Sequence, residues 1–232
     1  MSTYVLIPGG GSDSWYWHLV EPELRARGHD VVAPDLPYDD DAAGLREYTT
    51  AVVDALAGHD PSDVVLVAHS LGGFTAPLVC ERVSVRLMIL VAPMVPRPGQ
   101  LLGEWWVNTG WEQARREQAD RTGSTPIEVD DVHALYFHDV PADVETEAMH
   151  HERNQSGTPM GERWPLAAWP DVWTRVILCR DDRLFPADFQ RRQAEERLGI
   201  TADEIAGGHL PMLSRPNDLV EMFESLRVAA SR

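Results

Sequence analysis

A serine directly after a strand-like apolar run is the residue in this chain best suited to nucleophilic chemistry. Ser70 lies in the hexapeptide AHSLGG of residues 68–73, between the run VVLV at 64–67 and a predicted helix at 74–82. A sharp strand-to-helix turn strains the serine backbone, lifts its hydroxyl clear of the sheet and requires small side chains two residues away. Alanine and glycine occupy those two positions. The pattern predicts a nucleophile, although a capping serine in a tight turn is the alternative.

A serine hydroxyl needs a neighbouring base, and His209 is the best candidate among the nine histidines. It follows the last predicted strand in the loop AGGHLP, where two glycines and a proline allow the chain to fold over the sheet edge. An exposed loop histidine is the alternative. His69, beside the nucleophile, is expected to point away from the hydroxyl and to pack or form a hydrogen bond.

The base needs a carboxylate that orients it, and the loop after the predicted strand at 176–179 offers Asp181 and Asp182. Neighbouring side chains point in different directions, so one can serve the base while the other remains a surface charge. The residues alone leave this choice open.

Stabilising an oxyanion takes two N–H donors. Leu71, directly after the serine, is expected to supply one donor. The glycine-rich loop at residues 8–11 is expected to supply the other, from Gly10. A phosphate-binding loop is the alternative, but neither the GxGxxG spacing nor a P-loop lysine follows.

Strands alternate with helices along most of the chain, which predicts an α/β fold with a mostly parallel, doubly wound sheet. The unusual residues named above follow predicted strands, and such sheets bind ligands at the carboxyl ends of their strands. The alternation is lost at about 95–170, where a helical insertion is expected to cap the site. The predicted strands are 4–7, 30–33, 64–67, 86–91, 176–179 and 200–205, and the helices are 15–27, 45–56, 74–82, 186–198 and 211–226.

The insertion is rich in tryptophan, which suggests an apolar or aromatic substrate. Trp105 and Trp106, with Met94 beside the preceding strand end, are the predicted pocket walls. The alternative is that the tryptophans pack the insertion onto the sheet.

Composition limits the remaining function classes. The chain of 232 residues is 44% hydrophobic and 25% charged, as expected for one domain at 1–232, and its net charge of −17 argues against nucleic acid and anionic membranes as partners. Without a basic leader or a long apolar stretch, a cytoplasmic location and reduced Cys80 and Cys179 are expected. The histidines of the insertion lack metal-ligand spacing, so neither a metal nor another cofactor is expected. A homodimer is left open.

At this point the chain resembles the α/β-hydrolases, in the small serine esterase group that includes plant methyl-ester hydrolases and hydroxynitrile lyases. The resemblance is carried by residues 5–17, 28–36, the serine hexapeptide and 208–216. It implies a triad in the chain order serine, acid, histidine, and counting from Cys179 places the acid at Asp182. Pro8 departs from the histidine usual there, and Cys179 from a common glycine.

The same resemblance narrows the reaction. The lyases carry a threonine and a lysine where this chain has Gly9 and Leu210, which disfavours cyanohydrin cleavage. Relatives acting on halides or epoxides use an aspartate in place of Ser70. We therefore expect a serine hydrolase that cleaves small carboxylic esters or lactones through an acyl-enzyme. The alternatives are perhydrolase or cofactor-free oxygenase chemistry, lyase chemistry, and a non-catalytic module that binds a small molecule.

Overall fold

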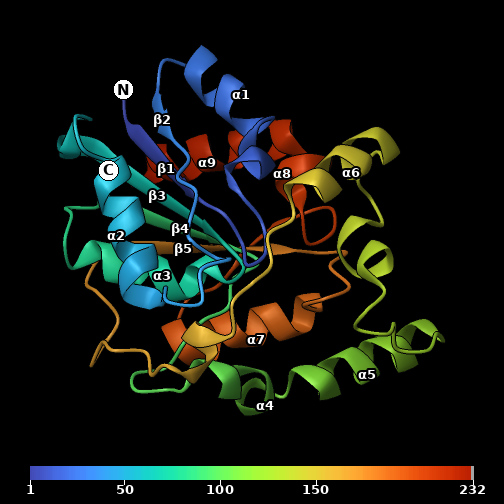
Figure 1. Ribbon diagram of the computed structural model, residues 1–232. Coiled ribbons are helices and arrows are strands. Elements are labelled where there is room, and N and C mark those ends of the chain that lie inside the picture. The colour runs from blue at the N-terminus through green and yellow to red at the C-terminus, as the bar shows by residue number, and fades with distance from the viewer. Residues whose placement is uncertain (231–232) are drawn as a thin grey trace.

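The computed structural model describes residues 1–230. Within this range a single parallel sheet contains six strands in the order β2-β1-β3-β4-β5-β6. The doubly wound α/β class expected from the sequence is confirmed (Figure 1). The strands are β1 (Thr3–Ile7), β2 (Asp30–Val32), β3 (Val64–His69), β4 (Leu87–Val91), β5 (Trp173–Cys179) and β6 (Asp203–Ile205).

Helices cover both faces of the sheet because successive strand side chains point to opposite sides. On β1, Val5 and Ile7 belong to one buried cluster, and Tyr4 and Leu6 belong to the other. The first cluster packs under α2 (Leu45–Ala55), α3 (Gly72–Cys80) and α7 (Ala187–Leu198). The second packs under α1 (Val20–Ala26) and α9 (Pro216–Ala229), on the other side of the sheet in Figure 1. Burial on both faces explains why these strands are continuous apolar runs.

The segment between β4 and β5 consists of short helices and loops that return the chain from the end of β4 to the start of the parallel strand β5 (Figure 1). Trp164 ties it to the core, since its indole N–H donates to the Phe74 carbonyl oxygen at 3.0 Å. The division of the chain into a core and a cap at about 95–170 stays a prediction. The elements of this segment are η3 (Leu102–Glu104), α4 (Trp105–Thr109), α5 (Trp111–Thr122), a π-helical turn η4 (His133–Phe137), α6 (Ala142–Ala148), η5 (Met149–His151) and η6 (Thr158–Gly161).

Two predicted helices are each divided in the structure, and a different proline accounts for each division. The expected helix at 15–27 is a 3₁₀ turn, η1 (Ser14–Trp17), followed by α1, in which Pro22 lies in the first turn. A continuous helix would place the Pro22 ring against the carbonyl four residues earlier. The expected helix at 211–226 is α8 (Pro211–Ser214) and α9, because Pro216 forces Arg215 out of the helical region, to φ −142° and ψ 49°. A further 3₁₀ turn is η2 (Pro61–Asp63).

Candidate active site

Ser70 lies in a strained turn between β3 and α3. Its φ of 49° is in the left-handed region, which non-glycine residues rarely adopt. The turn is held by its backbone: the Ser70 carbonyl oxygen accepts hydrogen bonds from the amides of Gly73 and Met94. A Cβ added to Gly72 would lie 3.0 Å from Ile7 Cγ2 and 3.4 Å from the Ala68 Cβ, so the turn requires small residues there. This is the strain that the hexapeptide predicts.

Three predicted residues from separate loops form one line of hydrogen bonds. The Ser70 hydroxyl lies 3.1 Å from His209 Nε2, and His209 Nδ1 lies 2.8 Å from Asp182 Oδ2. The side chains of His209 and Asp182 are 1% and 0% exposed. With Asp182 as a carboxylate, which can only accept, the proton of a neutral His209 lies on Nδ1 and leaves Nε2 to accept from the serine.

Asp182, and not its neighbour, lies behind the histidine. One of its oxygens accepts from the amides of Leu184 and Phe185 at 2.8 and 2.9 Å, and the other accepts from Gln190 Nε2 at 3.1 Å. These donors fix the orientation of the carboxylate. Asp181 has an exposed side chain and accepts from the Gly207 amide at 2.9 Å. The structure thus places Asp182, which the resemblance favoured, behind the histidine and Asp181 at the surface, a choice that the residues alone left open.

The glycine-rich loop lies across the same cavity as the serine. Gly10 and Leu71 both line the cavity, and a Cβ on Gly10 would lie 2.7 Å from Leu71 Cδ2. The loop is braced by the hydroxyl of Tyr38, which donates to the Pro8 carbonyl at 2.9 Å, and by Gln155 Oε1, which accepts from the Gly11 amide at 3.3 Å. The roles of the Gly10 and Leu71 amides stay predictions.

A cavity of about 760 Å³ opens beside Ser70 and His209. Its apolar lining includes Met94, Trp106, Val132, Met160 and Leu184, and residues 152–155 contribute polar lining. A space of this size accommodates a drug-sized ligand.

Of the three predicted wall residues, Met94 and Trp106 line the cavity and Trp105 does not. Trp105 is fully buried, packs against Phe189 in a T-shaped arrangement and donates from Nε1 to the Val95 carbonyl at 3.0 Å. The prediction of Trp105 as a pocket wall is therefore not met. Consecutive helical side chains diverge by about 100°, so only one of this pair faces the cavity.

Tyr136 is a cavity residue that the sequence did not single out. Its ring meets His209 edge-on at 5.5 Å between centroids, and burial, with Asp182 nearby, raises its pKa to about 12. The hydroxyl therefore stays protonated at neutral pH and can donate a hydrogen bond. Tyr136 lies in η4, where no periodic apolar pattern marks the inward positions.

Comparison with known protein families identifies the family of this chain. Residues 4–222 match the sequence model of a family described as "Alpha/beta hydrolase family". The chain belongs to this family. The resemblance found in the sequence is therefore confirmed.

Two relatives of this α/β hydrolase are plant proteins. It is 26% identical over 255 residues to the protein named "Probable esterase PIR7A" in Oryza sativa subsp. indica, with 98% of this chain and 96% of that protein covered. It is also 26% identical over 256 residues to methyl jasmonate esterase 1 of Vitis vinifera, with coverage of 96% and 95%. The crystal structure of polyneuridine aldehyde esterase superposes with a TM-score of 0.78 at 21% identity, covering 97% of this chain and 99% of that one, which supports the fold.

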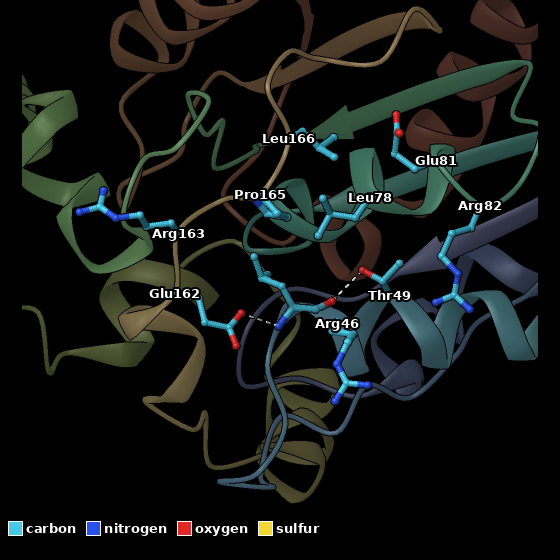
Figure 2. Close-up of a pocket in the computed structure, with 10 residues that line it drawn as sticks. Arg46, Thr49, Leu78, Glu81, Arg82, Glu162, Arg163, Pro165 and Leu166 are labelled. Atoms are coloured by element: carbon cyan, nitrogen blue, oxygen red, sulfur yellow. Dashed lines mark hydrogen bonds between the residues drawn. The ribbon is translucent and has the colours of Figure 1, made fainter.

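The hydrolase has a second hollow, of about 480 Å³, away from the serine. It lies between α2, α3 and residues 162–166, with an apolar floor at Leu78 and Leu166 (Figure 2). Two of its polar side chains bond to the start of α2: Glu162 accepts from the Leu45 amide, and the Thr49 hydroxyl donates to the Leu45 carbonyl. Ser70, Asp182 and His209 are all absent from the described residues that line it.

Two further observations concern metals and membranes. Within residues 1–230, no group of three or more histidine, cysteine or acidic side chains has the arrangement of a metal site. The same range contains no helix with both the length and the apolar character needed to cross a bilayer. Cys80 and Cys179 are both free thiols.

Proposed function

We propose that this protein hydrolyses small carboxylic esters through an acyl-enzyme on Ser70. The observation that carries the proposal is the buried hydrogen-bonded line from Ser70 through His209 to Asp182. Family membership and the relatives named as esterases support carboxylic ester hydrolysis. Lactones, which are cyclic esters, fall in the same substrate class.

In the proposed reaction His209 Nε2 takes the hydroxyl proton as Ser70 Oγ attacks the ester carbonyl carbon. The negative charge that develops on the carbonyl oxygen is stabilised by the amides of Gly10 and Leu71. His209 then returns the proton to the departing alkoxide, which leaves as the alcohol. Water, deprotonated by His209, releases the acid and restores the serine, while Asp182 holds the ring and stabilises its charged form.

The cavity supports an apolar or aromatic substrate. Trp106, Met94 and other apolar residues line the same cavity as the serine, so burial of an apolar acyl or alcohol group contributes to binding. Residues 95–170, which include Trp106, Tyr136 and Gln155 of the cavity lining, act in this proposal as a cap that selects the substrate.

Two positions disfavour lyase chemistry on the same scaffold. Leu210 lines the cavity directly after the proposed base and offers no cation for a cyanide ion. At Gly9 an added Cβ would lie 2.5 Å from His69 Nδ1, so the buried ring leaves no room for a threonine.

The test is a p-nitrophenyl ester assay of the wild type and Ser70→Ala, with Ser84→Ala, an exposed serine after α3, as the matched control. We expect Ser70→Ala to lose esterase activity and labelling by a fluorophosphonate probe, whereas Ser84→Ala retains both. Equal rates for Ser70→Ala and the wild type would exclude the proposal. A non-catalytic binding module would instead be favoured if Ser70→Ala binds a small-molecule ligand as tightly as the wild type does and the fluorophosphonate probe does not label the wild type. Halogenation that depends on hydrogen peroxide would indicate perhydrolase chemistry.

A further inference from the structure

The loop that carries His209 is held by hydrogen bonds to two aspartates, one on each side. On one side, the Asp181 carboxylate accepts from the Gly207 amide at 2.9 Å, and the Asp181 amide donates to the Gly207 carbonyl at 3.0 Å. These bonds tie the loop to the end of β5. Gly207 has a φ of 109°, so the loop depends on such bonds to hold an otherwise permissive backbone.

On the other side lies Asp139, from the segment between β4 and β5. Its Oδ2 accepts from the Gly208 amide at 2.7 Å, across 69 residues of sequence. The bond has a charged acceptor, and such hydrogen bonds are short and about twice as strong as neutral ones. Gly208 is joined directly to His209, so this contact reaches the base through one peptide unit.

The absence of a side chain at Gly208 makes this contact possible. A Cβ at that position would lie 2.6 Å from both Asp139 Oδ1 and His138 Nε2. Both atoms are buried without a hydrogen-bond partner among residues 1–230. The carboxylate and the imidazole therefore pack against the bare Cα of Gly208, and any other residue would displace them.

We infer that Asp139 is a positioning residue for His209, by which the segment between β4 and β5 fixes the loop of the catalytic base. The inference rests on the proposed function, because it takes His209 to be that base. Asp139 acts through the Gly208 backbone. The segment that lines the cavity thus also sets the geometry of the hydrogen bond between Ser70 and His209.

The direct test compares Asp139→Ala with Asp139→Asn in the p-nitrophenyl ester assay. Alanine removes the acceptor, so the loop is held on one side only. We expect kcat to fall by about 10- to 100-fold with KM within about threefold, because small misplacements of a catalytic group slow the reaction steeply. Asparagine retains an oxygen that can accept from Gly208, and we expect it to restore kcat to within about threefold of the wild type.

The matched control is Asp130→Ala, an exposed aspartate of the same segment. If the loss of a negative charge were the cause of the lower kcat, Asp130→Ala and Asp139→Asn would be slowed as much as Asp139→Ala. Thermal unfolding of each variant separates a positioning effect from a loss of fold, because only positioning changes kcat at an unchanged folded fraction.

A second variant approaches the same contact from the other partner. Gly208→Ala places a methyl group where Asp139 and His138 pack, and we expect it to lower kcat about as much as Asp139→Ala. In the double variant, alanine at 139 removes one of the two clashes and the same hydrogen bond is lost only once, so we expect the two effects to be less than additive. Gly161→Ala, where an added Cβ meets no atom within 4 Å, is the control.

The outcomes distinguish this inference from the proposed function. If Ser70→Ala keeps full activity, the proposed function fails. If Ser70→Ala is inactive but Asp139→Ala and Gly208→Ala both turn over at the wild-type kcat, the function stands and the inference is overturned. An Asp139→Asn variant as slow as Asp139→Ala would also overturn it. If Asp139→Ala does not fold, the Asp139→Asn and Gly208→Ala rates decide.

Discussion

His69 Nε2 lies 2.9 Å from the backbone carbonyl oxygen of His209, so the residue next to the nucleophile holds the residue proposed as its base. A carbonyl oxygen only accepts, and the proton of this bond must therefore be on His69 Nε2. Burial, and then the nearby His209, lower the pKa of His69 well below its usual value. A neutral His69 adds no positive charge beside His209 when the latter becomes protonated during the reaction.

Replacing His69 tests this contact. His69→Phe fills a similar volume without a donor, so the His209 carbonyl loses a buried hydrogen bond. Such a bond contributes about 1 kcal/mol, and loss of that amount from the transition state lowers kcat by roughly fivefold, with little change expected in KM. His69→Gln, whose amide can still donate, is expected to recover part of the loss. A wild-type kcat in His69→Phe would show that the contact does not position the base.

A second prediction separates the two neighbouring aspartates. Asp182→Asn presents an amide to His209 Nδ1 and favours the wrong tautomer of the ring, a change that lowers kcat about 10⁴-fold in serine hydrolases with this triad. Asp181→Asn, on the exposed side, retains an oxygen for the Gly207 amide and is expected to stay within about threefold of the wild type. Initial rates on a p-nitrophenyl ester measure both variants. A slow Asp181→Asn with a fast Asp182→Asn would reverse the assignment.

A third prediction concerns the adjacent tryptophans of α4. Trp106→Ala enlarges the cavity and is expected to shift the ester preference toward longer or bulkier acyl groups, with a small effect on stability. Trp105→Ala removes a fully buried indole, which costs about 3–5 kcal/mol of the free energy of unfolding. An acyl chain-length series and urea denaturation measure the two effects. Finding the change of preference in Trp105→Ala instead would contradict the assigned wall.

The serine turn could be predicted from sequence because its constraints are local. A strained φ at Ser70 and the lack of space around Gly72 follow from the strand, the serine and the small residues that flank it. The choice between Asp181 and Asp182 needed either the family resemblance or the structure. It depends on which side chain the loop buries, and neighbouring residues of equal chemistry carry no sign of that.

The cavity wall was less predictable because the segment between β4 and β5 lacks a regular period. Trp106 faces the cavity and Trp105 the core, and only the axial orientation of α4 decides between them. The hydrogen bond from the Gly208 amide to Asp139 joins residues that are 69 positions apart. The contact requires a glycine at 208, but a glycine in a loop does not indicate which distant carboxylate accepts from its amide, so the sequence gives no signal for the partner.

Glu224 on α9 carries a prediction about acid stability. Its carboxylate accepts from the Tyr4 hydroxyl at 2.6 Å and from Arg227 at 2.9 and 3.0 Å, and it lies 3.1 Å from His29 Nε2. Burial alone would raise the pKa of Glu224, but the hydrogen bonds from Arg227 and Tyr4 outweigh burial and lower it from 4.5 to about 2. These bonds join α9 to β1 and thus to the core of the sheet.

A depressed carboxyl pKa stabilises the fold above the unfolded value, and the contribution is lost as the pH falls through the folded value. We therefore expect Glu224→Gln to be less stable than the wild type at pH 6, and the difference to shrink as the pH falls from about 4.5 toward 2. Urea denaturation at pH 6 and at points below pH 4.5 measures it, with Glu221→Gln, an exposed glutamate of the same helix, as the control. A stability difference that stays constant with pH would show that Glu224 acts by packing, because only the ionised carboxylate links this contact to protons.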